Sequence, residues 1–129
     1  MLRDDLYEIK EIRTINEFEF FYEIHLNKDT DIYRGHFPSR PITPGACLLE
    51  IARELLEIHE KQPLDIRQIK SMKFLNIIEP SVHPDIVFHF IIKERLEDQR
   101  KVMVEIGAGS EVFTKMSMFF AENVPCNES

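Results

Sequence analysis

Residues 33–61, YRGHFPSRPITPGACLLEIARELLEIHEK, decide the fold of this chain. The stretch begins as a loop rich in Gly and Pro and continues as the longest helical pattern in the sequence. Thr43 is predicted to cap the helix and Pro44 to be its first residue, where the missing N–H of proline costs nothing. Apolar side chains surround the first two turns almost completely, which predicts a buried helix.

Most of the remaining sequence predicts strands. Apolar residues alternate with Glu and His from 17 to 26, as in a half-buried strand, whereas the weaker alternation in 1–15 fits a short helix or an edge strand. After Pro63 ends the helix, further strands are expected at residues 69–78, 85–93, 102–107 and 112–120. The last two are joined by a hairpin turn at 108–110, and the charged run 94–101 is interpreted as a solvated turn.

The expected order is therefore one or two strands, a long buried helix, and about four antiparallel strands. A single helix packed on one sheet normally has a wide polar face exposed to solvent, and this helix lacks such a face. Either the sheet curls around the helix or a second subunit covers it. The sequence thus predicts one α+β domain, residues 1–129, with an antiparallel sheet wrapped around a central helix.

Composition narrows the classes of partner. The net charge of −7 over 129 residues argues against nucleic acid or an anionic membrane as the main partner, and no stretch is long and apolar enough for a membrane span. The acidic start of the chain does not resemble a signal peptide. A disulfide between Cys47 and Cys126 is not expected, because one lies in a buried helix and the other in a polar tail; a reducing cytoplasmic setting fits better.

His36 and Glu50 are the candidate catalytic pair. A Glu on the apolar part of a helix is costly unless it is paired or functional, and burial would raise its pKa. The alternative is that Glu50 begins a solvated polar stripe at helical spacing, with members Glu50, Arg53, Glu54, Glu57 and Lys61. For His36 alone, a structural loop histidine is the competing interpretation.

The residues between this pair favour chemistry on a carbonyl compound. Gly45 and Ala46 offer free backbone N–H groups at the positive end of a helix, where a carbonyl oxygen that gains negative charge can be held. Three prolines stiffen the loop that carries the histidine. A base, an acid and an oxyanion site together suit removal of a proton next to a carbonyl, followed by loss of a β-substituent.

Residues 35–50, GHFPSRPITPGACLLE, resemble the signature G-H-F-P-G-x-P-x-x-P-G-V-x-x-x-E of the β-hydroxyacyl-acyl carrier protein dehydratases, the FabZ and FabA type. Weaker similarity extends over residues 31–120. The resemblance implies a hot-dog fold and a homodimer that joins its sheets edge to edge. It also implies active sites at the dimer interface, with the histidine from one subunit and the acid from the other.

The same resemblance implies a role for each candidate residue. His36 would remove the C2 proton of a 3-hydroxyacyl thioester, and Glu50 of the second subunit would protonate the departing hydroxyl. The N–H of Gly45 or Ala46 would hold the thioester carbonyl, and no metal or organic cofactor is needed. The acyl carrier protein that would bring the substrate is acidic, so Arg34 and Arg40 are candidate contacts, with scattered surface charge as the alternative.

Some positions depart from the family pattern. Ser39 replaces the usual Gly, and Glu54 replaces the usual Gln, so that a second carboxylate would raise the pKa of one of the two acids. The N-terminal region lacks the P-H-R-x-P-F-like segment of housekeeping dehydratases, which suggests a divergent, pathway-specific member. Aryl-polyene and similar pigment-lipid pathways use such variants.

Two other functions remain open. In a hot-dog acyl thioesterase, Glu50 would activate water against the thioester, although a histidine at the family position argues against it. In a non-catalytic acyl-binding or scaffold protein, Ser39 and Glu54 would mark lost activity. The remaining histidines show no metal-ligand spacing, and Cys47 is interpreted as a small buried apolar residue rather than a nucleophile.

Overall fold

The computed structural model describes residues 2–35 and 42–123, and only the backbone of Arg34 and Gly35. Its elements, in chain order, are β1 (Tyr7–Asn16), β2 (Glu19–Leu26), α1 (Asp31–Gly35), α2 (Gly45–Glu60), β3 (Leu64–Phe74), β4 (Asp85–Arg95), β5 (Gln99–Ala108) and β6 (Glu111–Glu122). The six strands form one antiparallel sheet in the order β1-β2-β4-β5-β6-β3.

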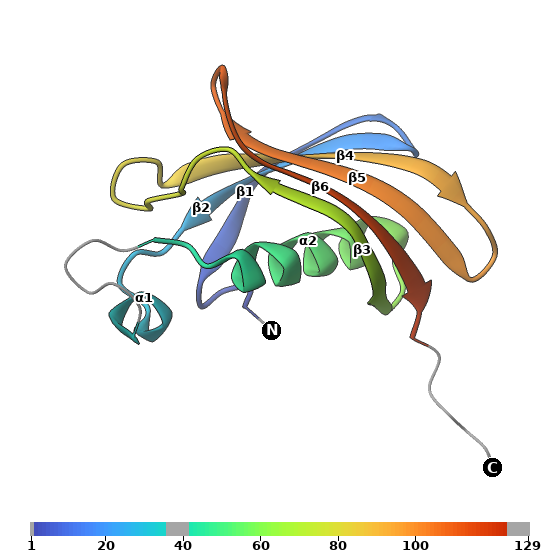
Figure 1. Cartoon of the computed structure of the whole chain (residues 1–129), viewed down its shortest axis with the longest axis horizontal. Coiled ribbons are helices and arrows are strands. Elements are labelled where there is room, and N and C mark those ends of the chain that lie inside the picture. Colours follow the sequence, from blue (N-terminus) through green and yellow to red (C-terminus); the bar gives the residue numbers. More distant parts are fainter. Residues whose placement is uncertain (1, 36–41, 124–129) are drawn as a thin grey trace, which may run out of the picture.

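The sheet curves over α2, which runs along its concave side (Figure 1). Two strands precede this helix and four follow it, so the predicted order and the α+β class are confirmed. The N-terminal segment, interpreted as either a short helix or an edge strand, is the edge strand β1. No helix in the described part of the chain is long and apolar enough to cross a membrane.

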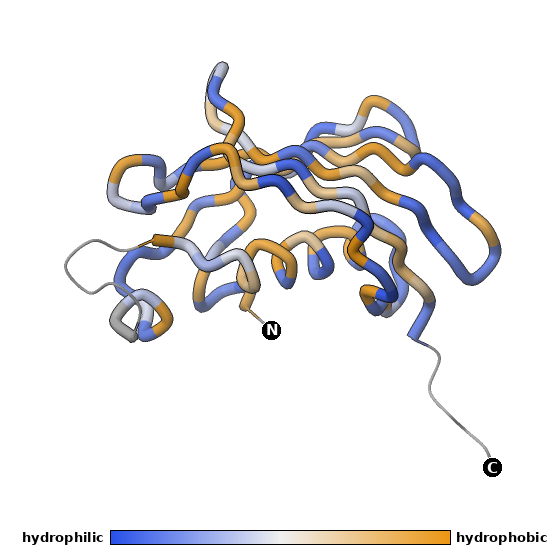
Figure 2. The backbone as a smooth tube through the Cα atoms, in the orientation of Figure 1, coloured by the Kyte–Doolittle hydropathy of each residue, from blue (hydrophilic) through white to orange (hydrophobic). Residues whose placement is uncertain are grey.

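The core lies between the concave face of the sheet and α2. Alternate residues of β2 and β4 are buried, as the period-2 pattern predicted, and they include Phe20, Tyr22, Ile24, Ile86, Phe88 and Phe90. They pack against the buried side of the helix, which includes Leu48, Ile51, Ala52, Leu55 and Leu56. Hydrophobic positions recur along α2 and the central strands, whereas the β4–β5 turn is mostly hydrophilic (Figure 2).

The start of α2 differs from the prediction. Pro44, not Thr43, occupies the N-cap position, and no side chain caps the helix. The prediction that Thr43 caps this helix is wrong because its hydroxyl is used elsewhere: it is hydrogen bonded to the Tyr33 hydroxyl at 2.8 Å, and both residues are buried. The backbone N–H of Thr43 donates to the Ile78 carbonyl, which ties the entry to α2 to the loop after β3.

Two further expectations need correction. The strand expected at 69–78 is β3, which begins at Leu64 and ends at Phe74 because its register is set by pairing with β6. The charged run 94–101 is not a solvated turn throughout, since β4 continues to Arg95 and β5 begins at Gln99. Only residues 96–98 connect the two strands. The predicted hairpin at 108–110 is confirmed, with Gly109 at a φ of 61°.

Candidate active site

The start of α2 presents free backbone donors. The N–H groups of Cys47 and Leu48 both donate to the Pro44 carbonyl, but those of Gly45 and Ala46 have no backbone partner among the described residues. They lie in the first turn of a 16-residue helix, where the helix dipole favours negative charge. Unpaired donors at the positive end of a helix are what the predicted oxyanion site at Gly45 and Ala46 requires.

A groove of about 470 Å³ opens beside these donors. Its walls are mostly apolar, and the residues that line it include Ile42, Pro44, Leu48, Leu75, Ile77 and Ile78. The Phe74 ring lies directly against Gly45, because a Cβ atom built on Gly45 would be 2.7 Å from the ring's Cζ atom. Glycine at this position thus allows an aromatic wall to approach the helix start closely.

The groove also has one polar residue without a hydrogen-bond partner. Thr114 lines it from β6, is fully buried, and has a hydroxyl with no partner among the described residues. Thr114 is paired with Phe74 across the β3–β6 ladder, so it is next to the residue that lies over Gly45. Neither the composition nor the spacing of the sequence indicated this threonine.

Glu50 lies on the same helix and is half-buried, with 36% of its side chain exposed. Arg53 binds it with a fork: Nε is 2.9 Å from Oε1 and Nη2 is 2.5 Å from Oε2. The hydrogen bonds from Arg53 outweigh burial and hold the pKa of Glu50 below its usual range. The expectation of a raised pKa for Glu50 is therefore wrong, because the sequence pattern did not reveal the bidentate contact whose effect exceeds that of burial.

The polar stripe expected on α2 is present only in part. Glu50, Arg53 and Glu57 are joined by ion pairs along one side of the helix, and Lys61 is exposed just beyond its end. Glu54 is not solvated and is only 3% exposed. Its carboxylate accepts hydrogen bonds from the backbone N–H groups of Leu2 and Arg3 and from the Tyr7 hydroxyl, at 2.7 to 3.1 Å.

Three predicted site residues cannot be placed with their side chains. His36 and Arg40 lie outside the described residues, and Arg34 is described only as backbone in α1. The segment that carries His36 begins after Gly35 and ends before Ile42. Residues on its two sides are joined to each other by the buried bond between the Tyr33 and Thr43 hydroxyls.

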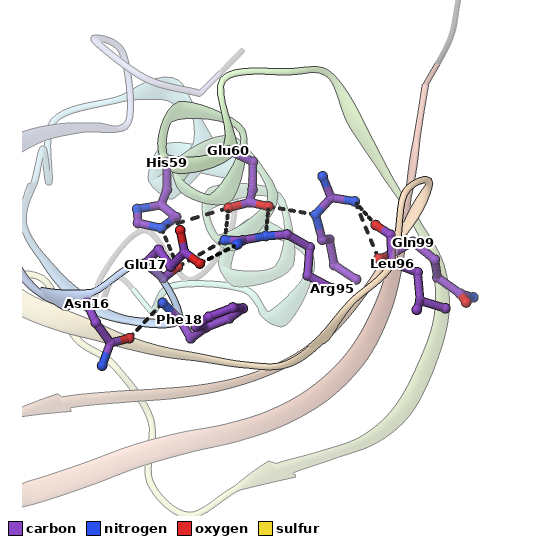
Figure 3. Close-up of polar contacts among 9 residues, drawn as sticks. Asn16, Glu17, Phe18, His59, Glu60, Arg95, Leu96 and Gln99 are labelled. Atoms are coloured by element: carbon purple, nitrogen blue, oxygen red, sulfur yellow. Dashed lines mark hydrogen bonds and ion pairs between the residues drawn. The ribbon is translucent and has the colours of Figure 1, made fainter.

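A cluster of charged residues lies at the other end of α2 (Figure 3). The Glu60 side chain is 4% exposed and binds Arg95 at 2.9 Å and Arg100 at 2.6 Å. Arg100 also donates to the Leu96 carbonyl at the β4–β5 turn. The cluster therefore joins the C-terminal turn of α2 to the β4–β5 hairpin.

The remaining candidate groups are also engaged in structure. His25 and His89 contact Asp85 and Glu19, respectively, and no group of three or more His, Cys, Asp or Glu among the described residues could hold a metal ion. Burial raises the pKa of the Cys47 thiol. A thiol with a raised pKa is a weak nucleophile at neutral pH, which agrees with its interpretation as a small apolar residue.

The fold is the hot-dog fold that the signature in residues 35–50 implied. The dehydratase heterocomplex ApeI:P from Xenorhabdus doucetiae aligns with a TM-score of 0.66 and 14% identity over 88% of this chain and 96% of that chain. A putative thioesterase, yhdA, from Lactococcus lactis aligns with a TM-score of 0.64 and 11% identity, over 88% and 91%. At these identities the two structures show the fold alone.

Sequence comparison identifies the family. The ApeI-like family model, described as ApeI dehydratase, matches residues 12–108, and the chain belongs to this family of dehydratases. The 3-hydroxyacyl-[acyl-carrier-protein] dehydratase FabZ of Rickettsia typhi is 31% identical over 97 residues. The match covers 65% of this chain and 66% of that relative, just under two thirds of its length.

Proposed function

We propose that the protein dehydrates 3-hydroxyacyl thioesters to trans-2-enoyl thioesters. The observation that carries this proposal is the start of α2, where the N–H groups of Gly45 and Ala46 have no backbone partner among the described residues and Gly45 lines an apolar groove. A thioester carbonyl bound there would become more acidic at C2, because the N–H groups and the helix dipole stabilise the enolate. Glu50 lies on the same helix but not among the residues that line this groove, and in this proposal it is the second reacting group.

In the proposed reaction, His36 removes the C2 proton, and the electron pair of that C–H bond forms the C2–C3 double bond. The C3–O bond breaks, and Glu50, in its protonated form, supplies the proton with which the hydroxyl leaves as water. The reaction consumes no oxidant or reductant and needs no cofactor. Because the Rickettsia typhi relative is named for an acyl-carrier-protein substrate, we propose that the thioester is carried by such a protein, with Arg34 and Arg40 as contacts for its acidic surface.

The proposed enzyme is a homodimer. β3 is an edge strand of the sheet, and β3 and the loop after it expose large apolar side chains at Ile69, Phe74, Leu75 and Ile77. An exposed edge with apolar residues is a surface that proteins normally cover. Pairing of two β3 edges would cover it, and His36 of one subunit would then act together with Glu50 of the other, as the resemblance implies.

The function is tested by incubating the protein with 3-hydroxyacyl-carrier protein and measuring enoyl product for wild type, His36→Ala and Glu50→Ala. We expect conversion by wild type and loss of conversion in both variants, which remain folded dimers. Wild type that is inert toward short and long acyl chains would overturn the proposal and favour an acyl-binding protein without catalysis.

Mixing the two inactive variants tests the shared site. A mixed dimer of His36→Ala and Glu50→Ala subunits has one site with both side chains intact and one site with neither. Random exchange of subunits should therefore restore about a quarter of wild-type activity. No recovery after verified exchange would contradict a site built from two subunits.

A second candidate function is hydrolysis of the acyl thioester. The observation that favours it is the fork from Arg53, which favours the ionised form of Glu50, because a glutamate can act as a general base only when it is ionised. In this reaction Glu50 would take a proton from water as the water attacks the thioester carbonyl. Release of free acid without enoyl product in the same assay would establish hydrolysis in place of dehydration.

A further inference from the structure

Arg53 is bound on three sides. Its Nε and Nη2 atoms donate to the two carboxylate oxygens of Glu50, and Nη1 donates to Glu57 at 2.6 Å and to the Leu64 carbonyl at 3.2 Å. Only 21% of its side chain is exposed. Glu57 is itself fixed, because it accepts the Leu64 N–H at 2.7 Å. The guanidinium therefore has little freedom to leave Glu50.

This arrangement differs from an ordinary surface ion pair. An exposed pair on a helix is worth little because both side chains move freely and water screens the charges. Here the planar guanidinium is held by the β3 start as well as by the helix, and the fork matches both oxygens of one carboxylate. Such a contact fixes the orientation of Glu50 as well as its charge.

We infer that Arg53 is a positioning residue that presents Glu50 to the substrate as an oriented carboxylate. The inference deepens the proposed function and rests on it where it concerns catalysis. For dehydration, Glu50 must be protonated when the hydroxyl leaves. The fork lowers the fraction of the protein in which Glu50 is protonated. For hydrolysis, the same fork favours the ionised form of Glu50, which is the form that can act as the general base.

The charges around Glu50 are consistent with this role. On α2, the cation that binds Glu50 is Arg53, and Glu54, one turn away, also lowers the pKa of Glu50 through a hydrogen bond. From β1, the Tyr7 hydroxyl faces this region, but it donates to Glu54. The β3 start contributes the Leu64 backbone, which binds Arg53 and Glu57 rather than Glu50. Removing Arg53 would thus remove the largest of the contributions that favour the carboxylate form of Glu50.

A direct test is the ¹³C NMR titration of the Glu50 side-chain carboxyl, assigned by its absence from Glu50→Gln. We expect a midpoint below that of an ordinary glutamate in wild type and a rise of about one pH unit in Arg53→Gln. Glu57→Gln is the matched control: it removes the other carboxylate from Arg53, keeps an acceptor for the Leu64 N–H, and should leave the midpoint unraised. An unchanged midpoint in Arg53→Gln would overturn the inference.

Two further measurements make the result decisive. If Arg53→Gln loses its circular-dichroism signal, Arg53→Lys replaces it; because Lys cannot form the fork, its midpoint should rise by a smaller amount, and an unchanged midpoint overturns the inference. In active protein, the pH dependence of kcat/KM is measured between about pH 4 and 8 for wild type and the Arg53 variant. The acidic limb of this profile should move in the same direction as the NMR midpoint of Glu50. A limb that stays in place while the midpoint moves would overturn the catalytic role of Arg53.

The titration does not depend on activity, so the two proposals can fail separately. Wild type without dehydratase or thioesterase activity, but with a low midpoint that rises in Arg53→Gln, would overturn the proposed function and the catalytic role of Arg53 while the pairing itself stands. Active wild type with an ordinary Glu50 midpoint would retain the function and overturn the role of Arg53.

Discussion

The hydroxyl groups of Tyr33 and Thr43 are hydrogen bonded at 2.8 Å, one on each side of the segment that carries His36. Both residues are buried, and burial raises the pKa of Tyr33 to about 12, so the phenol remains protonated at any physiological pH. The bond joins the end of α1 to the entry of α2. It therefore ties together the two described parts of the chain on either side of residues 36–41.

We predict that Tyr33→Phe lowers the free energy of unfolding by about 1 kcal/mol, because it leaves the buried Thr43 hydroxyl without its partner. Thr43→Val should have a similar cost for the reciprocal reason. Urea unfolding of both variants and of the double variant forms a double-mutant cycle. The double variant should lose less stability than the sum of the two single losses, and strictly additive losses would contradict the coupling.

Glu54 is predicted to be structural. Its two oxygens accept from three donors in the N-terminal segment, so Glu54→Gln must place its amide NH₂ against at least one N–H or O–H group. We expect a loss of about 1–3 kcal/mol in the free energy of unfolding, measured by urea denaturation. The control is Glu8→Gln, since Glu8 is an exposed residue of β1 and should be neutral. Equal effects of the two substitutions would contradict this role.

The sequence predicted the architecture because hydrophobic periodicity reports burial directly. Alternation in residues 17–26 and 85–93 identified two central strands and their buried faces, and the apolar run after Pro44 identified the central helix. Register is set by pairing between strands distant in sequence, which a local pattern does not contain. For that reason the local pattern predicts a strand from residue 69, five residues after the observed start of β3 at Leu64.

The chemistry around Glu50 was harder to predict for a similar reason. Spacing placed Arg53 and Glu57 on the same side of the helix, but it could not show that the β3 backbone holds the guanidinium in a fork. Likewise, Glu54 belongs to the polar stripe by spacing, and only the folded N-terminal segment reveals why it is buried. The direction of a pKa shift depends on such contacts more than on the burial that a pattern predicts.

The cluster around Glu60 predicts a pH dependence of stability. Burial alone would raise the pKa of Glu60, but its bonds to Arg95 and Arg100 together hold the pKa below the ordinary value. A carboxyl with a lower pKa in the folded state than in the unfolded state contributes stability above the unfolded-state value, about 4.3. That contribution is lost as the pH falls from there through the folded-state pKa.

We therefore expect Glu60→Gln to cost about 3 kcal/mol at neutral pH, because it leaves the buried Arg100 without its anionic partner. The difference in unfolding free energy between wild type and Glu60→Gln should shrink as the pH falls below about 4. Urea denaturation over a pH series measures it. The control is Glu122→Gln, because Glu122 lines the same surface depression as Glu60, Arg95 and Arg100. If the difference in unfolding free energy stays constant down to the lowest pH, ion pairing of Glu60 with Arg95 and Arg100 does not account for the stability.

Thr114 and Thr30 form a matched pair, because both are buried and both have a hydroxyl without a partner among the described residues. Valine has nearly the shape of threonine and no hydroxyl to desolvate, so Thr114→Val and Thr30→Val should each raise the free energy of unfolding by about 1 kcal/mol. Only Thr114 lines the groove beside Gly45. If the groove binds the acyl thioester through this hydroxyl, Thr114→Val should raise KM while Thr30→Val does not. A gain in stability with no change in KM for either variant would exclude the Thr114 hydroxyl from substrate binding.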